Sequence, residues 1–266
     1  MQLPTVTTLL QGFSLSSDQG AFAFCSVNLV EGTDEAGGLR RIIVDTGHVG
    51  RHVLLEEALR QRDLEGGDID IVVLTHAHWD HVQNGDLFDQ AVFMVHPREL
   101  KYTRSPHRND HATPRWTKSV LDTYQLKEVT EGAEVIPGVS VIEAPGHSAG
   151  TIALSVATGE GTAVISGDAV QDSLVARQRR NALVFWDEQQ ANSSVSKLVA
   201  LADIIYPGHD QAFRLSKSGR VEYIQEFTFS LTNAPPSQRG VVLSERPPFQ
   251  PYIMEGIEEQ RTLDLG

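Results

Sequence analysis

The chain of 266 residues contains one cysteine, Cys25. A disulfide within the chain and a site built from several thiolates are therefore both excluded, and with them the paired cysteines that a structural zinc site normally shows. Cys25 lies in the apolar stretch Phe22-Ala23-Phe24-Cys25-Ser26-Val27, which predicts part of a strand over residues 21–30. We interpret this thiol as a small core residue rather than a reactive group.

Long apolar runs and positive charge are also scarce. The first ten residues include Pro4 and several threonines but no basic region followed by an apolar run, so neither a signal peptide nor a membrane helix is expected, and a cytoplasmic location follows by default.

Thirty-five acidic residues against 22 basic ones give a formal charge of −13, which opposes attraction to nucleic acid or anionic membranes. We interpret the basic clusters, 177–180 and 98–118, as solvated faces. The expected partner is a small molecule.

The most informative segment is the hexapeptide His76-Ala77-His78-Trp79-Asp80-His81. It follows Ile71-Val72-Val73-Leu74-Thr75, a short β-branched run that predicts a buried strand. Three imidazoles and a carboxylate therefore lie on one loop at the end of a strand. Imidazole nitrogen and carboxylate oxygen suit zinc and similar metal ions.

Three further ligand-type residues follow predicted strands at turns marked by glycine. They are His147 in Pro-Gly-His, Asp168 in Ser-Gly-Asp and His209 in Pro-Gly-His. Glycine permits the tight turns that a ligand at a strand end requires. A single histidine is usually a surface or core residue, but five histidines and two aspartates in this pattern favour a metal site.

With these motifs the sequence resembles the metallo-β-lactamase-fold superfamily. The resemblance rests on His76-x-His78-x-Asp80-His81, on His147, Asp168 and His209 in that order, and on the earlier turn Val44-Asp45-Thr46-Gly47. It covers residues 20–215 and implies an α/β fold, a four-layer αββα sandwich of two mixed β-sheets flanked by helices.

The resemblance also implies a division of the ligands between two zinc ions, with iron or manganese as alternatives, about 3.5 Å apart. His76, His78 and His147 would bind the first ion, and Asp80, His81 and His209 the second. Asp168 would bridge both ions. Asp45 is expected to accept the free ring N–H of a ligand histidine or to anchor the hexapeptide loop, with a simple Asx turn as the alternative.

The order of apolar patterns predicts strands near residues 4–10, 21–30, 40–45, 71–75, 91–95, 126–129, 139–144, 151–156, 162–166 and 203–206, and helices near 53–59, 172–180 and 189–201. Because the ligands are spread from residue 76 to residue 209, we expect a single domain over residues 1–266.

Two segments are interpreted as additions to this domain. Residues 96–125 contain several aromatic side chains, among them Tyr102 and Trp116, and are expected to form a lid over the substrate. Residues 228–266 form a C-terminal extension, rich in proline around Gly240-Val241-Val242-Leu243, that either covers the pocket or pairs with another subunit as a homodimer. His107 and His111 are not expected to bind metal, because the ligand set is complete without them.

The predicted function is metal-dependent hydrolysis of an ester, lactone or related acyl bond by a hydroxide shared between the ions. Asp80 would pass a proton to the leaving group, and Trp79, Tyr102, Trp116 and Gln171 are the predicted pocket residues. The setting of Asp168 is similar to quorum-signal lactonases, except that Gln171 stands where that branch has a tyrosine. Two alternatives remain open, namely a phosphodiesterase or nuclease, as proposed for similar stand-alone domains of animals, and a persulfide dioxygenase with a single iron.

Overall fold

The computed structural model describes residues 2–18, 20–230, 244 and 248–263. Its helices are α1 (His52–Arg60), α2 (Trp79–Val82), α3 (Pro97–Tyr102), α4 (Thr117–Leu121), α5 (Ser173–Gln178) and α6 (Glu188–Leu201). The short 3₁₀ turns are η1 (Val49–Arg51), η2 (Gly66–Asp68), η3 (Gly85–Phe88), η4 (Asp168–Val170) and η5 (Ile257–Thr262). None of the helices within the described residues has both the length and the apolar character needed to cross a membrane.

The first sheet is mixed and carries the hexapeptide. Its strands, in spatial order, are β1 (Thr5–Leu10), β4 (Val27–Thr33), β5 (Leu39–Val44), β6 (Ile71–Val73), β7 (Val92–Val95) and β8 (Gln125–Glu128). The pairs β1/β4 and β4/β5 are antiparallel, whereas β5, β6, β7 and β8 run parallel to their neighbours. The β-branched sequence of β6 fits a strand enclosed by parallel neighbours.

The second sheet carries the three downstream ligands. Its strands, in spatial order, are β16 (Val221–Tyr223), β15 (Phe213–Leu215), β14 (Ile204–Pro207), β12 (Gly161–Gly167), β11 (Ile152–Thr158), β10 (Val139–Glu143) and β9 (Glu134–Ile136). The pair β12/β14 is parallel, so both strands end at the same edge of the sheet.

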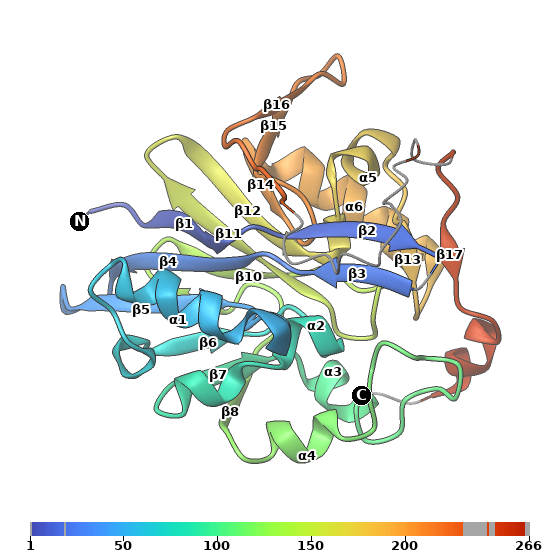
Figure 1. The fold of residues 1–266 in the computed structure, drawn as a ribbon, viewed down its shortest axis with the longest axis horizontal. Coiled ribbons are helices and arrows are strands. Elements are labelled where there is room, and N and C mark those ends of the chain that lie inside the picture. Colours follow the sequence, from blue (N-terminus) through green and yellow to red (C-terminus); the bar gives the residue numbers. More distant parts are fainter. Residues whose placement is uncertain (1, 19, 231–243, 245–247, 264–266) are drawn as a thin grey trace, which may run out of the picture.

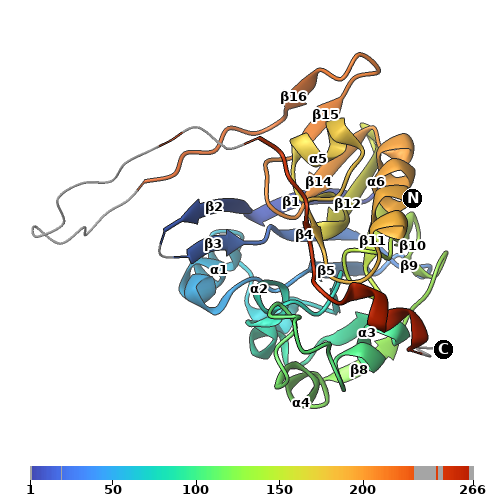
Figure 2. The ribbon, with the colours of Figure 1, turned by 90° about the vertical axis from the view of Figure 1, so that its right-hand side faces the viewer.

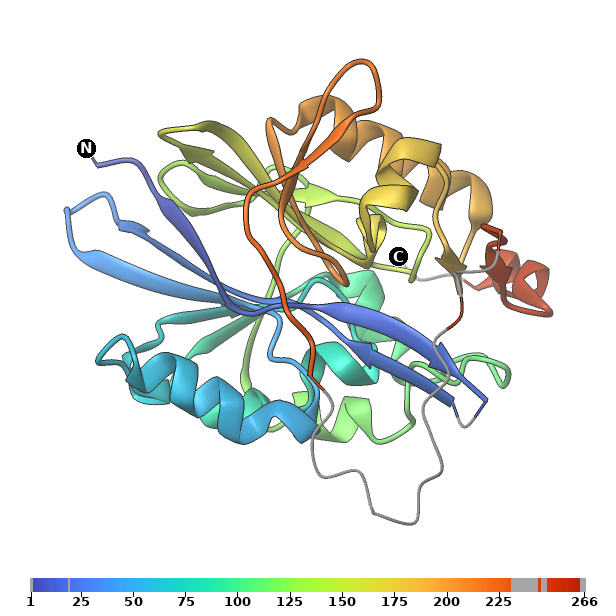
Figure 3. The same cartoon turned by 45° about the horizontal axis from the view of Figure 1, so that its top comes forward.

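The two sheets pack face to face, and helices cover their outer faces (Figures 1 and 3). The central core joins Val30, Ile42 and Val73 of the first sheet to Leu154 and Ile165 of the second. On the outer face of the first sheet, α1 packs its buried leucines, which are four residues apart. α5 and α6 cover the second sheet in the same way (Figure 2). The predicted αββα sandwich is confirmed.

The predicted strand over residues 21–30 is wrong, because the chain forms two strands there. β3 (Gly20–Phe24) pairs with β2 (Phe13–Ser17) in a separate hairpin, and β4 begins only at Val27. Cys25 lies between the two strands, fully buried, with its Sγ 3.1 Å from the Asp80 carbonyl. Cys25 is therefore the expected core residue, but not a strand residue.

Residues 248–263 of the second added segment contact the first added segment, residues 96–125. In the first, α3 and α4 follow β7. In the second, β17 (Tyr252–Ile253) pairs with β13 (Leu183–Val184), and η5 lies beside the loop of residues 107–109. Arg108 and Glu259 join the two segments by a pair of hydrogen bonds. The apolar run 240–243 lies outside the described residues, and the domain boundaries and the dimer remain predictions.

Candidate metal centre

The hexapeptide lies in the loop that leaves β6 and enters α2. His78 is the N-terminal cap residue of α2, which places Asp80 and His81 in the first turn of the helix. His147 follows β10, Asp168 begins η4 directly after β12, and His209 follows β14. All seven predicted ligand side chains therefore meet at one edge of the sandwich, and all are buried.

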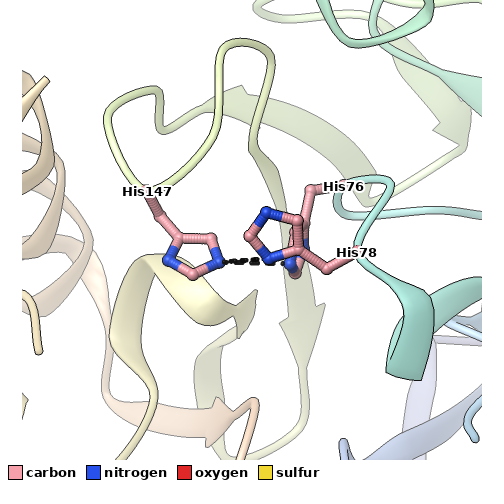
Figure 4. A group of neighbouring side chains, drawn as sticks. All are labelled: His76, His78 and His147. Atoms are coloured by element: carbon pink, nitrogen blue, oxygen red, sulfur yellow. Dashed lines mark hydrogen bonds between the residues drawn. The ribbon is translucent and has the colours of Figure 1, made fainter. Parts of the chain in front are cut away.

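Three histidines form the first group (Figure 4). The Nε2 atom of His147 lies 3.2 Å from His76 Nε2 and 3.0 Å from His78 Nδ1. On the other side of its ring, His147 Nδ1 lies 2.6 Å from the Leu183 carbonyl. A proton on that Nδ1 leaves Nε2 as an acceptor, which is the form that binds a metal ion.

Asp80, His81 and His209 form the second group, and Asp168 lies between the two groups. Asp168 Oδ1 is 3.4 Å from His81 Nε2 and 3.2 Å from His209 Nε2, while its Oδ2 is 3.5 Å from His147 Nε2. Asp80 Oδ2 is 3.4 Å from His209 Nε2. The two oxygens of Asp168 thus face different groups, as a bridging carboxylate requires.

The first group is electrically neutral. Burial lowers the pKa of His76 well below its usual value and lowers that of His78 to about 3, and the neighbouring imidazoles act in the same direction. Burial also lowers the pKa of His147, although Asp168 opposes this effect. These rings therefore offer unprotonated nitrogens at neutral pH.

The second group has the opposite electrostatics. Burial acts to lower the pKa of His81, but Cys25 and the nearby aspartates outweigh it and raise this pKa well above the usual value. Burial also acts to lower the pKa of His209, but Asp168 outweighs this effect and raises the pKa above its usual value. The pKa of Asp168 is held well below its usual value, against the effect of burial, by His209 and His81.

Asp45 supports the second group from outside. Its Oδ2 lies 2.8 Å from His81 Nδ1 and accepts a hydrogen bond of 2.8 Å from the Thr75 hydroxyl, while its Oδ1 accepts the Thr75 N–H. Asp45 has a backbone φ of 59°, which is uncommon for a residue other than glycine. Asp45 therefore occupies Nδ1 of His81, so that Nε2 of this ring faces the other ligand-type residues.

Gly208 is required by close packing against the centre. A Cβ atom at this position would lie 2.1 Å from Asp168 Oδ1. Gly146 is needed for two reasons, since it has a φ of +126° and a Cβ there would lie 2.0 Å from the Ala191 nitrogen. The glycines of the two Pro-Gly-His turns thus let the loops approach their neighbours.

The four predicted pocket residues have different surroundings. Trp79 is half-buried and packs edge-on against His48. Tyr102 is buried and donates a hydrogen bond to Asp110, and Trp116 is 45% exposed at the start of α4. Gln171 is buried, with its Nε2 3.0 Å from Asn181 Oδ1 and 3.3 Å from His147 Nδ1, the ring nitrogen that faces away from the other ligands.

Three residues near the centre were not found from the sequence. The ring of Phe185 lies 4.8 Å from that of His78 and 5.7 Å from that of His147. His48 lies 5.1 Å from Trp79, and its Nδ1 accepts the Gly50 N–H. The Glu99 carboxylate accepts hydrogen bonds from the backbone N–H groups of Ala77 and Gly150, which lie in the loops that carry His76, His78 and His147. Only His48 carried a local signal, because it follows Asp45-Thr46-Gly47 directly.

The donor set fits a pair of metal ions. Three groups of three, made up only of the predicted ligands, have donor atoms within 4.8 Å of one another: His76, His78 and His147; His76, His81 and Asp168; and Asp80, His81 and His209. Buried Asp80 Oδ2, His81 Nε2 and Asp168 Oδ1 lack a hydrogen-bond partner among the described residues, as expected of atoms that face a cation. Nitrogen and oxygen donors from strand ends of two sheets thus form a cluster that could hold metal ions in a protein of αββα architecture.

Comparison with known proteins agrees with this class. The family model of the metallo-beta-lactamase superfamily matches residues 21–209, and the chain belongs to that family. It is 27% identical over 228 residues to metallo-beta-lactamase domain-containing protein 1 of Xenopus laevis, covering 82% of this chain and 84% of the relative. It is 28% identical over 175 residues to an N-acyl homoserine lactonase of Bacillus thuringiensis, covering 62% and 66%.

Solved structures show the same fold at low identity. A probable metal-dependent hydrolase from Staphylococcus aureus has a TM-score of 0.68 at 18% identity, over 86% of this chain and all of that one. The dizinc quorum-quenching lactonase AidC has a TM-score of 0.60 at 18% identity, over 86% of this chain and 93% of that one.

Proposed function

We propose that this protein is a hydrolase that binds two zinc ions and cleaves an ester, lactone or related acyl bond of a small molecule. The observation that carries the proposal is the position of Asp168, whose two oxygens face the two ligand groups. The names of an N-acyl homoserine lactonase and a dizinc lactonase among the similar proteins support the same chemistry.

Two bound divalent ions would lower the pKa of a bound water, so that a hydroxide is available at neutral pH, and would polarise the bond to be cleaved. The protein holds the ligand rings in the required tautomers, through Leu183 behind His147 and Asp45 behind His81. Asp80 is buried, and burial raises the pKa of its carboxyl group. With one oxygen bound, the other oxygen of Asp80 can carry a proton to the leaving group.

The substrate pocket is proposed to have apolar walls. Phe185 packs against the rings of His78 and His147, and it shares an apolar cluster with Trp79. Flat, apolar groups next to the scissile bond would be bound by such walls. We therefore expect aromatic or other planar esters and lactones to be preferred over acyl-homoserine lactones.

The first test is elemental analysis of the purified protein followed by a panel of lactones, aryl esters, thioesters, a cephalosporin and a phosphodiester. We expect about two zinc ions per chain, as in other two-metal hydrolases, and turnover of esters or lactones. One tightly bound iron per chain would contradict the dinuclear centre and favour the dioxygenase. Turnover of the phosphodiester alone would contradict an acyl substrate and favour the phosphodiesterase or nuclease.

The location of the pocket is tested with two tryptophan variants. Trp79→Ala should raise the KM for aromatic esters by about tenfold, because an aromatic contact contributes about 0.5–1.5 kcal/mol beyond its buried area. Trp116→Ala is the matched comparison, since its side chain is exposed on α4. A rise confined to Trp116→Ala would instead place the pocket in the segment 96–125.

A further inference from the structure

Glu99 is a buried carboxylate in contact with both loops that carry the first ligand group. It lies on α3 and has no exposed surface. One of its oxygens, Oε1, accepts the Ala77 N–H at 2.9 Å, and Ala77 lies between His76 and His78. The other oxygen, Oε2, accepts the Gly150 N–H at 2.7 Å and the Ser148 hydroxyl at 2.8 Å, directly after His147.

Both carboxylate oxygens of Glu99 accept hydrogen bonds from these two loops. Among the described residues, it forms no ion pair with a lysine, arginine or histidine. An unpaired carboxylate is costly to bury, and a neutral residue would fill the same space without that cost. Its three strong hydrogen bonds to the loops are the compensation that the structure provides.

The backbone of α3 fits closely against the second of these loops. A Cβ atom at Gly150 would lie 2.4 Å from the Glu99 nitrogen and 2.9 Å from His96 Nδ1. Only glycine at position 150 therefore allows α3 to lie this close to residues 147–150. Glu99 and Gly150 together set the separation between the loop of residues 76–78 and the loop of residues 147–150.

We propose that Glu99 is a positioning residue that sets the affinity of the first metal site, formed by His76, His78 and His147, and leaves the second site unchanged. The inference rests on the proposed metal centre. The three histidines come from two loops, and Glu99 is bonded to the backbone of both. None of its hydrogen bonds reaches Asp80, His81 or His209.

The test measures zinc affinity by chelator competition in two backgrounds. His209→Ala weakens the second site and isolates the first, whereas His147→Ala does the reverse. Glu99→Gln retains the shape of the side chain, but it replaces one accepting oxygen by an amide N–H group. That group would face an N–H or O–H donor of one loop, so at least one hydrogen bond is lost. We expect Glu99→Gln to raise the Kd by about 10- to 100-fold in the His209→Ala background, the usual effect of removing a group that supports a metal ligand. In the His147→Ala background the Kd should change less than about threefold, within the scatter expected for independent sites.

Two further variants separate positioning from general stability. Thr103→Val removes a buried hydroxyl at the end of α3 that bonds only within its own segment, and it should lower stability without changing either Kd. Ser148→Ala removes one of the three hydrogen bonds to Glu99, so it should produce a smaller rise in the Kd of the first site even if Glu99→Gln fails to fold.

The outcomes are distinct. Equal weakening of both sites by Glu99→Gln, or an unchanged first site in a folded variant, would overturn the positioning role. Failure of the unmodified protein to bind zinc would contradict the proposed function instead. A correctly folded Glu99→Gln with weakened binding at the first site only is the expected result.

Discussion

At the scale of residues, protonation distinguishes the two halves of the centre. The three histidines of the first group have lowered pKa values, and that of His78 is about 3. The pKa values of His81 and His209 in the second group are raised. A metal ion must displace a proton from a charged imidazole but not from a neutral one. Protons would therefore compete with an ion in the second group much more than with an ion in the first.

This difference predicts the order in which the ions leave on acidification. Below the raised pKa of His81, zinc affinity at the second group should fall by about tenfold per pH unit for each proton displaced. The first group should stay neutral and retain its ion. Metal content after dialysis at a series of pH values from about 7.5 to 5.5 should thus fall from two ions per chain to one. Simultaneous loss of both ions, or prior loss from the first group, would contradict this order.

At the scale of elements, local patterns indicated which ligand-type side chains meet, but not the residues that support them. Each ligand follows an apolar strand, and turns containing glycine mark the downstream three, so local patterns were sufficient. Glu99 acts through contacts with residues 77 and 150, and no local pattern indicates such a pairing. The hydrogen bond from the Tyr102 hydroxyl to Asp110 is another such pairing, and the pocket role of Tyr102 stays a prediction.

The C-terminal segment was likewise beyond local prediction. β17 contains two residues, and its partner β13 lies about seventy positions earlier in the chain. Pairing of such short strands depends on the packing of side chains around them. Met254 provides that packing, because it is 1% exposed and shares a cluster with Phe185 and Ala112.

Met254→Ala should therefore destabilise the protein by about 2–5 kcal/mol, the usual cost of removing a large buried apolar side chain. It should also reduce turnover, since Phe185 packs against His78 and His147. Arg108→Ala is the control, because its bond to Glu259 joins exposed groups that water and salt screen, so the midpoint should stay close to that of the unmodified protein. Urea denaturation of both variants provides the measurement. An unchanged midpoint for Met254→Ala would show that the segment is not docked on Phe185.

At the scale of the whole molecule, the candidate metal centre combines residues from the two sheets. His76, His78, Asp80 and His81 follow β6 of the first sheet, whereas His147, Asp168 and His209 follow β10, β12 and β14 of the second. Each proposed site therefore takes ligands from both halves of the sandwich. This arrangement could not be read from the hexapeptide alone, but it follows once the strand order places β6 opposite the second sheet.

Removal of the metal ions should consequently lower the stability of the entire fold rather than that of one loop. A ligand present at about 1,000 times its Kd stabilises the folded state by about 4 kcal/mol. For a protein of this size, each kcal/mol corresponds to about 2–4 °C in Tm, so treatment with a chelator should lower the Tm by about 10 °C. Zinc should restore it and magnesium should not, because magnesium prefers oxygen ligands to imidazole. A Tm that is unaffected by both chelator and zinc would show that no ion ties the two sheets together.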